Sequence, residues 1–420
     1  MANNLSSNIT RPLAKIFLEA FESSRVVTKT VNTQLLSGRF NPSTGTKVDF
    51  KRPHDYNSIR TSGGDISGAT KSDIIAGKAT GTVQPYFTSA TEWSNIQEAL
   101  ELDQLEQILE PMARRLVTDI EVDLSKFMRI NTGLNYGARG TAVDAWSDVA
   151  GAGAMMDSVG VPMSDNKYYL MNPFTTTALA SAQSGLNAAD GLVRTAFEKA
   201  QIASNFGGMK ALTSNALSSY TSGTTTDRSG DLKAAPDATY VTAKDTMQQT
   251  MVIETLGSGT IEAGDQIQVA GVNRLNIATR QVVLDAAGAA VPWTGTVLSV
   301  VTIAGNEATV VVSGAAIYEA NGQYNNVDAA PASGAIITIL GAAATVYQPN
   351  LFYTEQAFGL GTVKLPKLYS TDTIATTEDG MSIRVSKYSD GDANTQKIRF
   401  DLLPAYAVFN PNFAGQGYGV

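Results

Sequence analysis

The stretch IQEALELDQLEQILEPMARRLVTDIEVDLSKFMRIN, residues 96–131, decides the fold expected for this chain. Apolar side chains recur in it every three or four positions, at Leu102, Leu105, Leu109, Met112, Leu116, Ile120, Leu124 and Phe127. That spacing places them along one face of a long helix, which is expected to pack into the core. Because proline lacks an amide donor and clashes with the preceding turn, Pro111 predicts a break near Glu110.

A second helix is expected near the N-terminus. Ile16, Phe17, Ala20 and Phe21 recur at helical spacing after Pro12. This amphipathic piece either packs on the body of the protein or reaches a neighbouring subunit as an arm.

Residues 44–90 are expected to form a long hairpin. Thr46–Phe50 alternates polar and apolar residues as a strand does, and Gly81–Phe87 supplies the other flank. The residues between these flanks are rich in Gly, Ser, Thr and Asp. A compact enzyme rarely carries so long an irregular excursion unless it serves as a lid or an interaction arm.

The chain after the long helix predicts an α+β body. We expect a helix over Val143–Met156, a short buried strand over Lys167–Met171 and an amphipathic helix over Leu192–Ile202. Ser219–Ala238 has no apolar period and is interpreted as a linker.

Short β segments separated by glycine-rich turns follow this linker, and their spacing is typical of a small all-β sandwich or barrel. The expected segments are Met247–Glu254, Asp265–Gly271, Gly295–Ile303 and Ala308–Ser313, with an end near Ile336–Leu340. From Asn350 mixed strands return, and Met381–Tyr388 with Lys397–Phe409 is expected to form a hairpin.

The composition favours a protein that buries surface in subunit contacts. Hydrophobic residues make up 43% of the chain and charged residues only 17%, and interface cores are depleted of charge. The net charge of -8 and the lack of a basic run argue against tight binding of a phosphate backbone. There is no cysteine, no signal-peptide core and no apolar run of transmembrane length, so we expect a protein made and kept in a cytoplasm.

Few residues suggest chemistry. His54 is the single histidine and is expected to be an ordinary exposed side chain. Asp390, Asp392 and Asn394 are spaced like the first ligands of a calcium loop, but Asp, Gly and Asn also favour a hairpin turn, which we expect here. Ser164–Lys167 contains an overlapping S-x-x-K and S-D-N by chance. We therefore expect no catalytic, cofactor or metal site.

Five stretches, in their order along the chain, resemble the coat proteins of short-tailed, Salmonella-type phages. They are Thr141–Ala150, Tyr168–Pro173, Asn205–Leu212, Gly264–Val272 and Asn350–Tyr353. Each stretch alone is a weak signal, whereas the ordered set covers most of the chain. Thr46–Gly81 and the tail after Met381 match only loosely.

This resemblance implies the tailed-phage and herpesvirus capsid fold, also called the Johnson fold, of α+β class. The implied parts are an N-terminal arm (1–43), an extended loop (44–95), a spine helix with peripheral domain (96–136), the first part of an axial domain (137–224), an inserted β-domain (225–345) and a return to the axial and peripheral body (346–420).

The resemblance also implies the function of a major capsid protein in an icosahedral shell. Copies of the chain would assemble as pentamers and hexamers in the host bacterial cytoplasm, with a scaffolding protein, a portal protein and DNA that is enclosed without tight binding. DNA packaging would expand the precursor into the mature virion capsid. Some related shells are crosslinked from lysines of the extended loop; Lys71 and Lys78 are available, but we expect no crosslink. Phe17, Asp65 and Asp265 are the candidate contacts between subunits, one each in the arm, the loop and the inserted domain.

Three other classes of protein compete with this interpretation. An encapsulin-type compartment shell is typically shorter and lacks a large inserted β-domain. A phage tail or fibre component usually shows repeats or coiled-coil heptads, which this chain lacks. An acidic hydrolase would need a carboxylate pair across a cleft, and the sequence places no such pair.

Overall fold

The computed structural model describes residues 7–36, 45–94, 105–184, 199, 202–369 and 372–420. The chain divides into two compact units, each assembled from stretches far apart in sequence. Unit 1 comprises Met1–Asp49, Thr80–Ser125 and Phe358–Ala407, and unit 2 comprises Phe50–Ala79, Lys126–Ala357 and Val408–Val420. In the part that the structure describes, no helix has the length and apolar content needed to cross a membrane.

Helix α3 (Leu105–Ile130) confirms the long helix, but the break expected near Glu110 is wrong. The helix runs through Pro111 without interruption. Pro111 lies on the exposed side, where water can hydrate the carbonyl that loses its amide partner. Leu109, Leu116 and Ile120 are buried as expected, whereas Leu102 lies outside the described residues.

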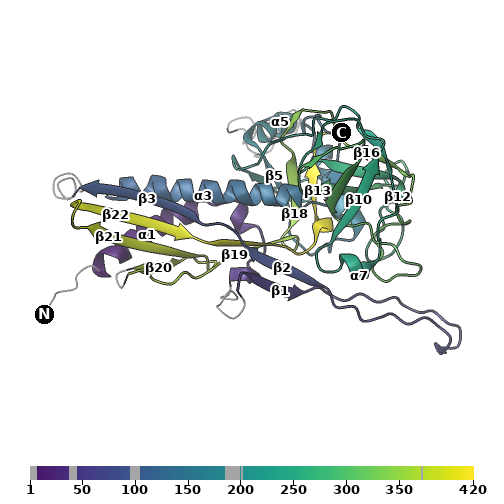
Figure 1. The fold of residues 1–420 in the computed structure, drawn as a ribbon, viewed down its shortest axis with the longest axis horizontal. Helices are drawn as coiled ribbons and strands as arrows, with labels where there is room; N and C mark the ends of the chain where they lie inside the picture. The colour runs from purple at the N-terminus through teal and green to yellow at the C-terminus, as the bar shows by residue number, and fades with distance from the viewer. Residues whose placement is uncertain (1–6, 37–44, 95–104, 185–198, 200–201, 370–371) are drawn as a thin grey trace. The chain divides into compact units, whose positions relative to one another are not determined.

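A four-stranded sheet forms much of unit 1 (Figure 1). Its order is β20 (Thr373–Thr376), β21 (Ser382–Asp390), β22 (Thr395–Leu402) and β3 (Phe87–Ser94). Helix α1 (Ser7–Ser24) lies against β20 and β21. The hairpin expected near the C-terminus is confirmed as β21 and β22, but its second flank ends at Leu402 and the chain starts another strand at Pro404.

A second four-stranded sheet contains the flanks of the long hairpin. Its order is β1 (Lys47–Lys51), β2 (Lys78–Val83), β23 (Pro404–Val408) and β19 (Phe358–Thr362). The flank expected over Gly81–Phe87 is divided, since β2 ends at Val83 and β3 begins at Phe87. Pro85 lies between them and has no amide to donate to a ladder. Two 3-10 turns, η1 (Val27–Lys29) and η2 (Gln34–Leu36), precede β1, and η2 packs against β19.

Unit 2 contains a six-stranded sheet and two helices that contact each other. The sheet order is β4 (Leu134–Tyr136), β24 (Ala414–Gly417), β18 (Asn350–Thr354), β5 (Lys167–Met171), β7 (Met209–Thr213) and β6 (Asn205–Phe206). The helices are α4 (Trp146–Val159) and α5 (Pro173–Ser184), and η3 (Pro411–Phe413) precedes β24. The strand Lys167–Met171 is confirmed, and Leu192–Ile202 lies mostly outside the described residues.

Helix α4 begins and ends later in the sequence than the helix predicted over Val143–Met156. Two local interactions set its ends. The Asp148 carboxylate accepts the amides of Asp144 and Ala145, both at 3.1 Å, and so fixes the start. Gly160 ends the helix at φ +102°, a backbone conformation that favours glycine.

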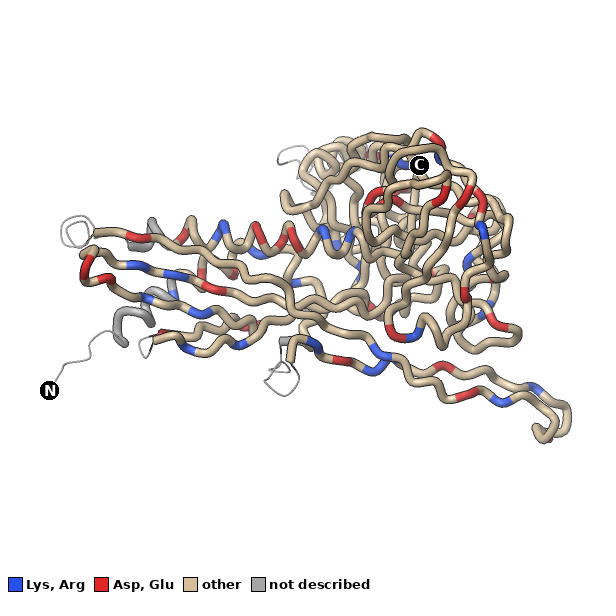
Figure 2. Tube along the Cα trace, in the orientation of Figure 1, with Lys and Arg blue, Asp and Glu red and all other residues tan. Residues whose placement is uncertain are grey.

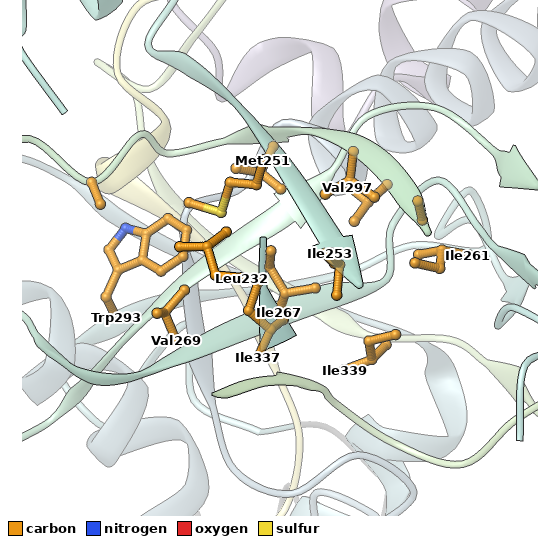
Figure 3. Packing of buried hydrophobic residues seen from close by; sticks show 14 of the residues in the cluster. Leu232, Met251, Ile253, Ile261, Ile267, Val269, Trp293, Val297, Ile337 and Ile339 are labelled. Atoms are coloured by element: carbon orange, nitrogen blue, oxygen red, sulfur yellow. The ribbon is translucent and has the colours of Figure 1, made fainter. Parts of the chain in front are cut away.

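The expected β module is a closed antiparallel barrel. Its strands, in order around the barrel, are β10 (Gln248–Glu254), β15 (Ala308–Ser313), β13 (Pro292–Val297), β12 (Gln266–Asn273), β16 (Ile336–Ile339) and β9 (Ser229–Leu232). All six strands contribute buried apolar side chains to one core, which Figure 3 shows around Trp293 and Ile267. Two short pairs accompany it, β8 (Tyr220–Thr221) with β17 (Val346–Tyr347) and β11 (Thr260–Ile261) with β14 (Val301–Thr302), as does helix α7 (Tyr240–Ala243).

The linker expected over Ser219–Ala238 is therefore wrong. Strand β9 lies inside it and pairs with β10 on one side and β16 on the other, which closes the barrel. Its sequence, Ser-Gly-Asp-Leu, carries one large apolar residue, so apolar alternation could not identify it.

Candidate functional site

The carboxylate of Asp265 lies fully buried directly before β12. Its Oδ2 accepts the amides of Gly223 and Glu262, each at 3.0 Å. These two hydrogen bonds fix the segment that leads into the barrel against the turn that precedes β12. A buried carboxylate retains its charge at moderate cost only when charged or polar partners surround it.

Three arginines surround this carboxylate, and with Asp265 they form what we term the arginine cluster. Arg139 Nη1 and Arg228 Nη2 each lie 3.8 Å from Asp265 Oδ1. Arg129, from the last turn of α3, donates to the hydroxyl of Ser218 at 3.2 Å and to the carbonyl of Ala263 at 3.2 Å. Two guanidinium groups thus lie within ion-pair distance of the Asp265 carboxylate, and Arg129 is attracted to it without a direct contact.

Tyrosine rings supply the remaining partners of the arginines. The Arg129 guanidinium lies 4.3 Å from the ring centroid of Tyr220, and the Arg139 guanidinium lies 5.6 Å from that of Tyr418. Burial raises the pKa of both tyrosines, so both stay protonated at neutral pH. Their neutral rings attract the guanidinium groups through cation–π interactions.

Gln416 connects the arginine cluster to the six-stranded sheet. It lies on β24 and is fully buried. Its amide nitrogen donates to the carbonyl of Arg129 at 3.1 Å, and its amide oxygen accepts from Arg139 Nη2 at 3.0 Å. Gly264 must stay a glycine, since its φ is +102° and a Cβ would overlap the Arg129 guanidinium. The cluster therefore joins the last turn of α3, the sheet and the barrel through buried polar contacts within unit 2.

Arg274 makes a second junction between the barrel and the rest of unit 2. Its fully buried guanidinium donates to the carbonyls of Gly133 and Thr294 and, at 3.3 Å, to the side-chain oxygen of Asn412. Burial lowers the pKa of Arg274 to about 9. The guanidinium satisfies carbonyls from three parts of the chain, which is a structural role.

The structure does not bring the three predicted contact residues together. Phe17 and Asp265 are fully buried, so in this conformation neither side chain offers surface to another subunit. Asp65 is exposed near the tip of the hairpin of residues 52–77, where its Oδ1 accepts the amide of Ser67 at 2.9 Å. This hydrogen bond lowers the pKa of Asp65. That Phe17 and Asp265 take part in subunit contacts stays a prediction. In this conformation the contacts would have to come from the neighbouring residues of their segments, because both side chains are buried.

Phe17 stacks on Phe400 of β22, with ring centroids 3.9 Å apart. Replacing Phe17 with leucine is expected to lower the free energy of unfolding of the unassembled chain by about 1 kcal/mol, because aromatic pairs stabilise beyond their buried area. Urea denaturation measures this change. Lys15→Ala, at an exposed position of the same helix, is the control and should cost less than about 0.5 kcal/mol. Equal effects of the two substitutions would argue against the intrachain role.

The other singled-out residues have ordinary surroundings. His54 is exposed, as expected. Asp390 accepts the amides of Asp392 and Ala393 at 3.1 and 3.3 Å, and Asn394 adopts φ +52°, so this segment is the turn that joins β21 and β22. The sequence analysis missed the arginine cluster, because its four members lie on distant segments and only Gly264–Val272 drew attention to one of them.

Comparison with known proteins then decides the family. The model of the family described as "P22 coat protein - gene protein 5" matches residues 1–419. The chain belongs to the P22 coat protein family.

A related protein with clear sequence identity to this chain agrees with this assignment. The major capsid protein of Acyrthosiphon pisum secondary endosymbiont phage 1 is 46% identical over 424 residues, which cover both chains completely. Membership of the P22 coat protein family confirms two expectations, the tailed-phage capsid fold and the function of a phage major capsid protein. The family is one of coat proteins and not a class of enzymes.

Solved structures that are similar to this P22 coat protein family member share little sequence with it. The capsid protein of cyanophage P-SCSP1u is 12% identical, with a TM-score of 0.45 over 93% of this chain and 86% of that one. A solved chain of Mycobacterium phage Che8 is 11% identical, with a TM-score of 0.47 over 93% of this chain and 90% of that one.

Proposed function

We propose that copies of this chain assemble as pentamers and hexamers into a closed icosahedral shell that encloses a phage genome. A scaffolding protein guides a precursor in the host bacterial cytoplasm, a portal protein occupies one vertex, and DNA packaging expands the precursor into the virion capsid. We propose no catalytic activity, no cofactor and no crosslink from Lys71 or Lys78. DNA is enclosed without tight binding, in keeping with the net charge of -8.

The hairpin of residues 52–77 is the observation that carries this proposal. Most of its side chains are exposed, among them Ile59, Ile66 and Ile74. Exposed isoleucines on an extended arm bury little apolar surface in a monomer, and a neighbouring subunit would cover them. We assign residues 44–95 to the extended loop, with Asp65 as its candidate contact, and residues 225–345 to the inserted domain.

The proposal is tested by expressing the full chain with and without its candidate scaffolding protein, followed by sedimentation and electron microscopy. We expect uniform closed particles with the scaffolding protein and irregular ones without it. Uniform particles without any scaffold would favour an encapsulin-type shell, and trimers or tubes would favour a tail or fibre component. A monomer that persists under all assembly conditions would overturn the proposal.

A further inference from the structure

The base of the hairpin, which comprises residues 52–57 of the first limb and 72–77 of the second, is docked on the segment around Arg280 and on the loop Tyr318–Asn325. Both hairpin limbs and this loop line an open groove of about 880 Å³. The hairpin and the loop both belong to unit 2. In Figure 1 the hairpin runs past α7 and extends beyond it to a free tip.

Polar contacts hold both limbs of the hairpin. On the first limb, the Asp55 carboxylate pairs with the Arg280 guanidinium, and the Asn57 side-chain amide donates to the carbonyl of Asn321 at 2.8 Å. On the second limb, the Gln323 side-chain amide donates to the carbonyl of Asp73 at 2.6 Å. Contacts to both limbs restrict rotation of the hairpin as well as its distance from the loop.

An apolar contact reinforces the base of the hairpin. Ile75 and Tyr324 pack against a small buried cluster that includes Tyr240 and Ile317. The rings of Tyr240 and Tyr324 stack with centroids 3.6 Å apart. Gly77 passes so close that a Cβ would lie 2.8 Å from the carbonyl oxygen of Lys244. The limb therefore lies in direct contact with the inserted domain at this point.

Arg280 has a strained backbone that its side chain's contacts offset. Its φ is +58°, which is unfavourable for a residue with a long side chain. From this conformation its guanidinium reaches the Asp55 carboxylate and the carbonyls of Gln323 and, at 2.6 Å, Asn325. Such strain persists where surrounding contacts determine the conformation, and it often marks a functional position.

The hairpin beyond these contacts is exposed. Residues 58–68 are exposed throughout and include Ile59, Asp65 and Ile66. Figure 2 shows charges of both signs along the hairpin. The hairpin thus has a docked base and a projecting tip.

We propose that Arg280 is a positioning residue for assembly. It fixes the docked base of the hairpin to the inserted domain, so that the tip projects in one direction and meets a neighbouring copy of the chain with little loss of conformational entropy. This inference rests on the proposed function and adds the inserted domain as the element that orients the extended loop.

Hydrogen exchange of the unassembled full chain, read by mass spectrometry, tests the inference. In Arg280→Gln, peptides that cover residues 53–58 and 70–77 should exchange roughly tenfold faster, because local opening becomes easier. Peptides of the barrel strands should keep their wild-type rates. Arg280→Lys retains the positive charge beside Asp55 and should give intermediate rates.

Arg60→Gln is the matched control, since Arg60 is an exposed arginine of the same hairpin, and it should leave exchange unchanged. Asp55→Asn removes the ion pair from the hairpin side and should reproduce the effect of Arg280→Gln if that variant fails to fold. Unchanged hairpin exchange in both variants would overturn the inference, as would faster exchange spread through the barrel. Because exchange is measured before assembly, its outcome is independent of whether the chain forms shells.

Discussion

Replacing Asp265 with asparagine is expected to lower the free energy of unfolding of unit 2 by about 3–5 kcal/mol, because removing one partner of a buried ion pair leaves uncompensated charge. Arg129, Arg139 and Arg228 would then converge without a carboxylate between them. The asparagine oxygen can take the place of Oδ2 and accept the amides of Gly223 and Glu262. Its NH2 group then takes the place of Oδ1 and faces the guanidinium groups of Arg139 and Arg228, which are also donors. We expect the barrel to lose its fixed attachment to the last turn of α3 and to the sheet.

Urea denaturation followed by the fluorescence of Trp293 measures this loss. Trp93 and Trp146 are replaced with phenylalanine in all variants, so that the signal comes from the barrel core. Asp144→Asn is the matched control, because Asp144 is exposed in the same unit and the substitution removes the same charge. If the two substitutions cost the same, the arginine cluster does not stabilise the junction.

Replacing Trp293 with alanine is expected to lower the free energy of unfolding of the same unit by about 3–5 kcal/mol. The indole is fully buried, its ring covers Gly295, and its nitrogen donates to the carbonyl of Gly314 at 2.9 Å. The substitution leaves a large cavity among the strands of the barrel and an unpaired buried carbonyl. Both effects act on the barrel core, where the surrounding backbone is closed and has little freedom to collapse.

Scanning calorimetry of the unassembled chain should show the melting temperature of the barrel-containing unit lowered by roughly 10 °C. The control is Trp146→Ala, which removes an indole that is 61% exposed and should shift the transition little. A transition that does not move in Trp293→Ala would mean that the barrel is not part of the cooperative unit.

Local patterns in the sequence predicted the elements with strong apolar signals. Lys167–Met171 is a strand with the predicted bounds. A short apolar run that is followed at once by Asn-Pro is compatible with few structures other than a strand. Ala308–Ser313 also has its predicted bounds. Pro111 misled the prediction because proline's cost in a helix depends on which side of the helix it occupies, and sequence alone did not give that side.

Elements that depend on distant partners could not be predicted. Strand β9 is defined by backbone pairing with β10 and β16, and its own side chains carry almost no periodic signal. The arginine cluster gathers Arg129, Arg228 and Asp265 from segments that no local rule connects. The pairing of Asp55 with Arg280 likewise joins positions separated by 225 residues.

The first and last strands of the barrel, β9 and β16, are hydrogen-bonded neighbours, and the chain enters and leaves through the paired strands β8 and β17. The two points where the domain departs from the body and returns to it are therefore about 4.8 Å apart, one strand spacing. A segment inserted between β8 and β17 can therefore vary in length while the pairing of these two strands stays intact. A segment that replaced the barrel would also have to supply a carboxylate in the place of Asp265, because Arg139 and Arg129 would otherwise be buried without a counter-charge.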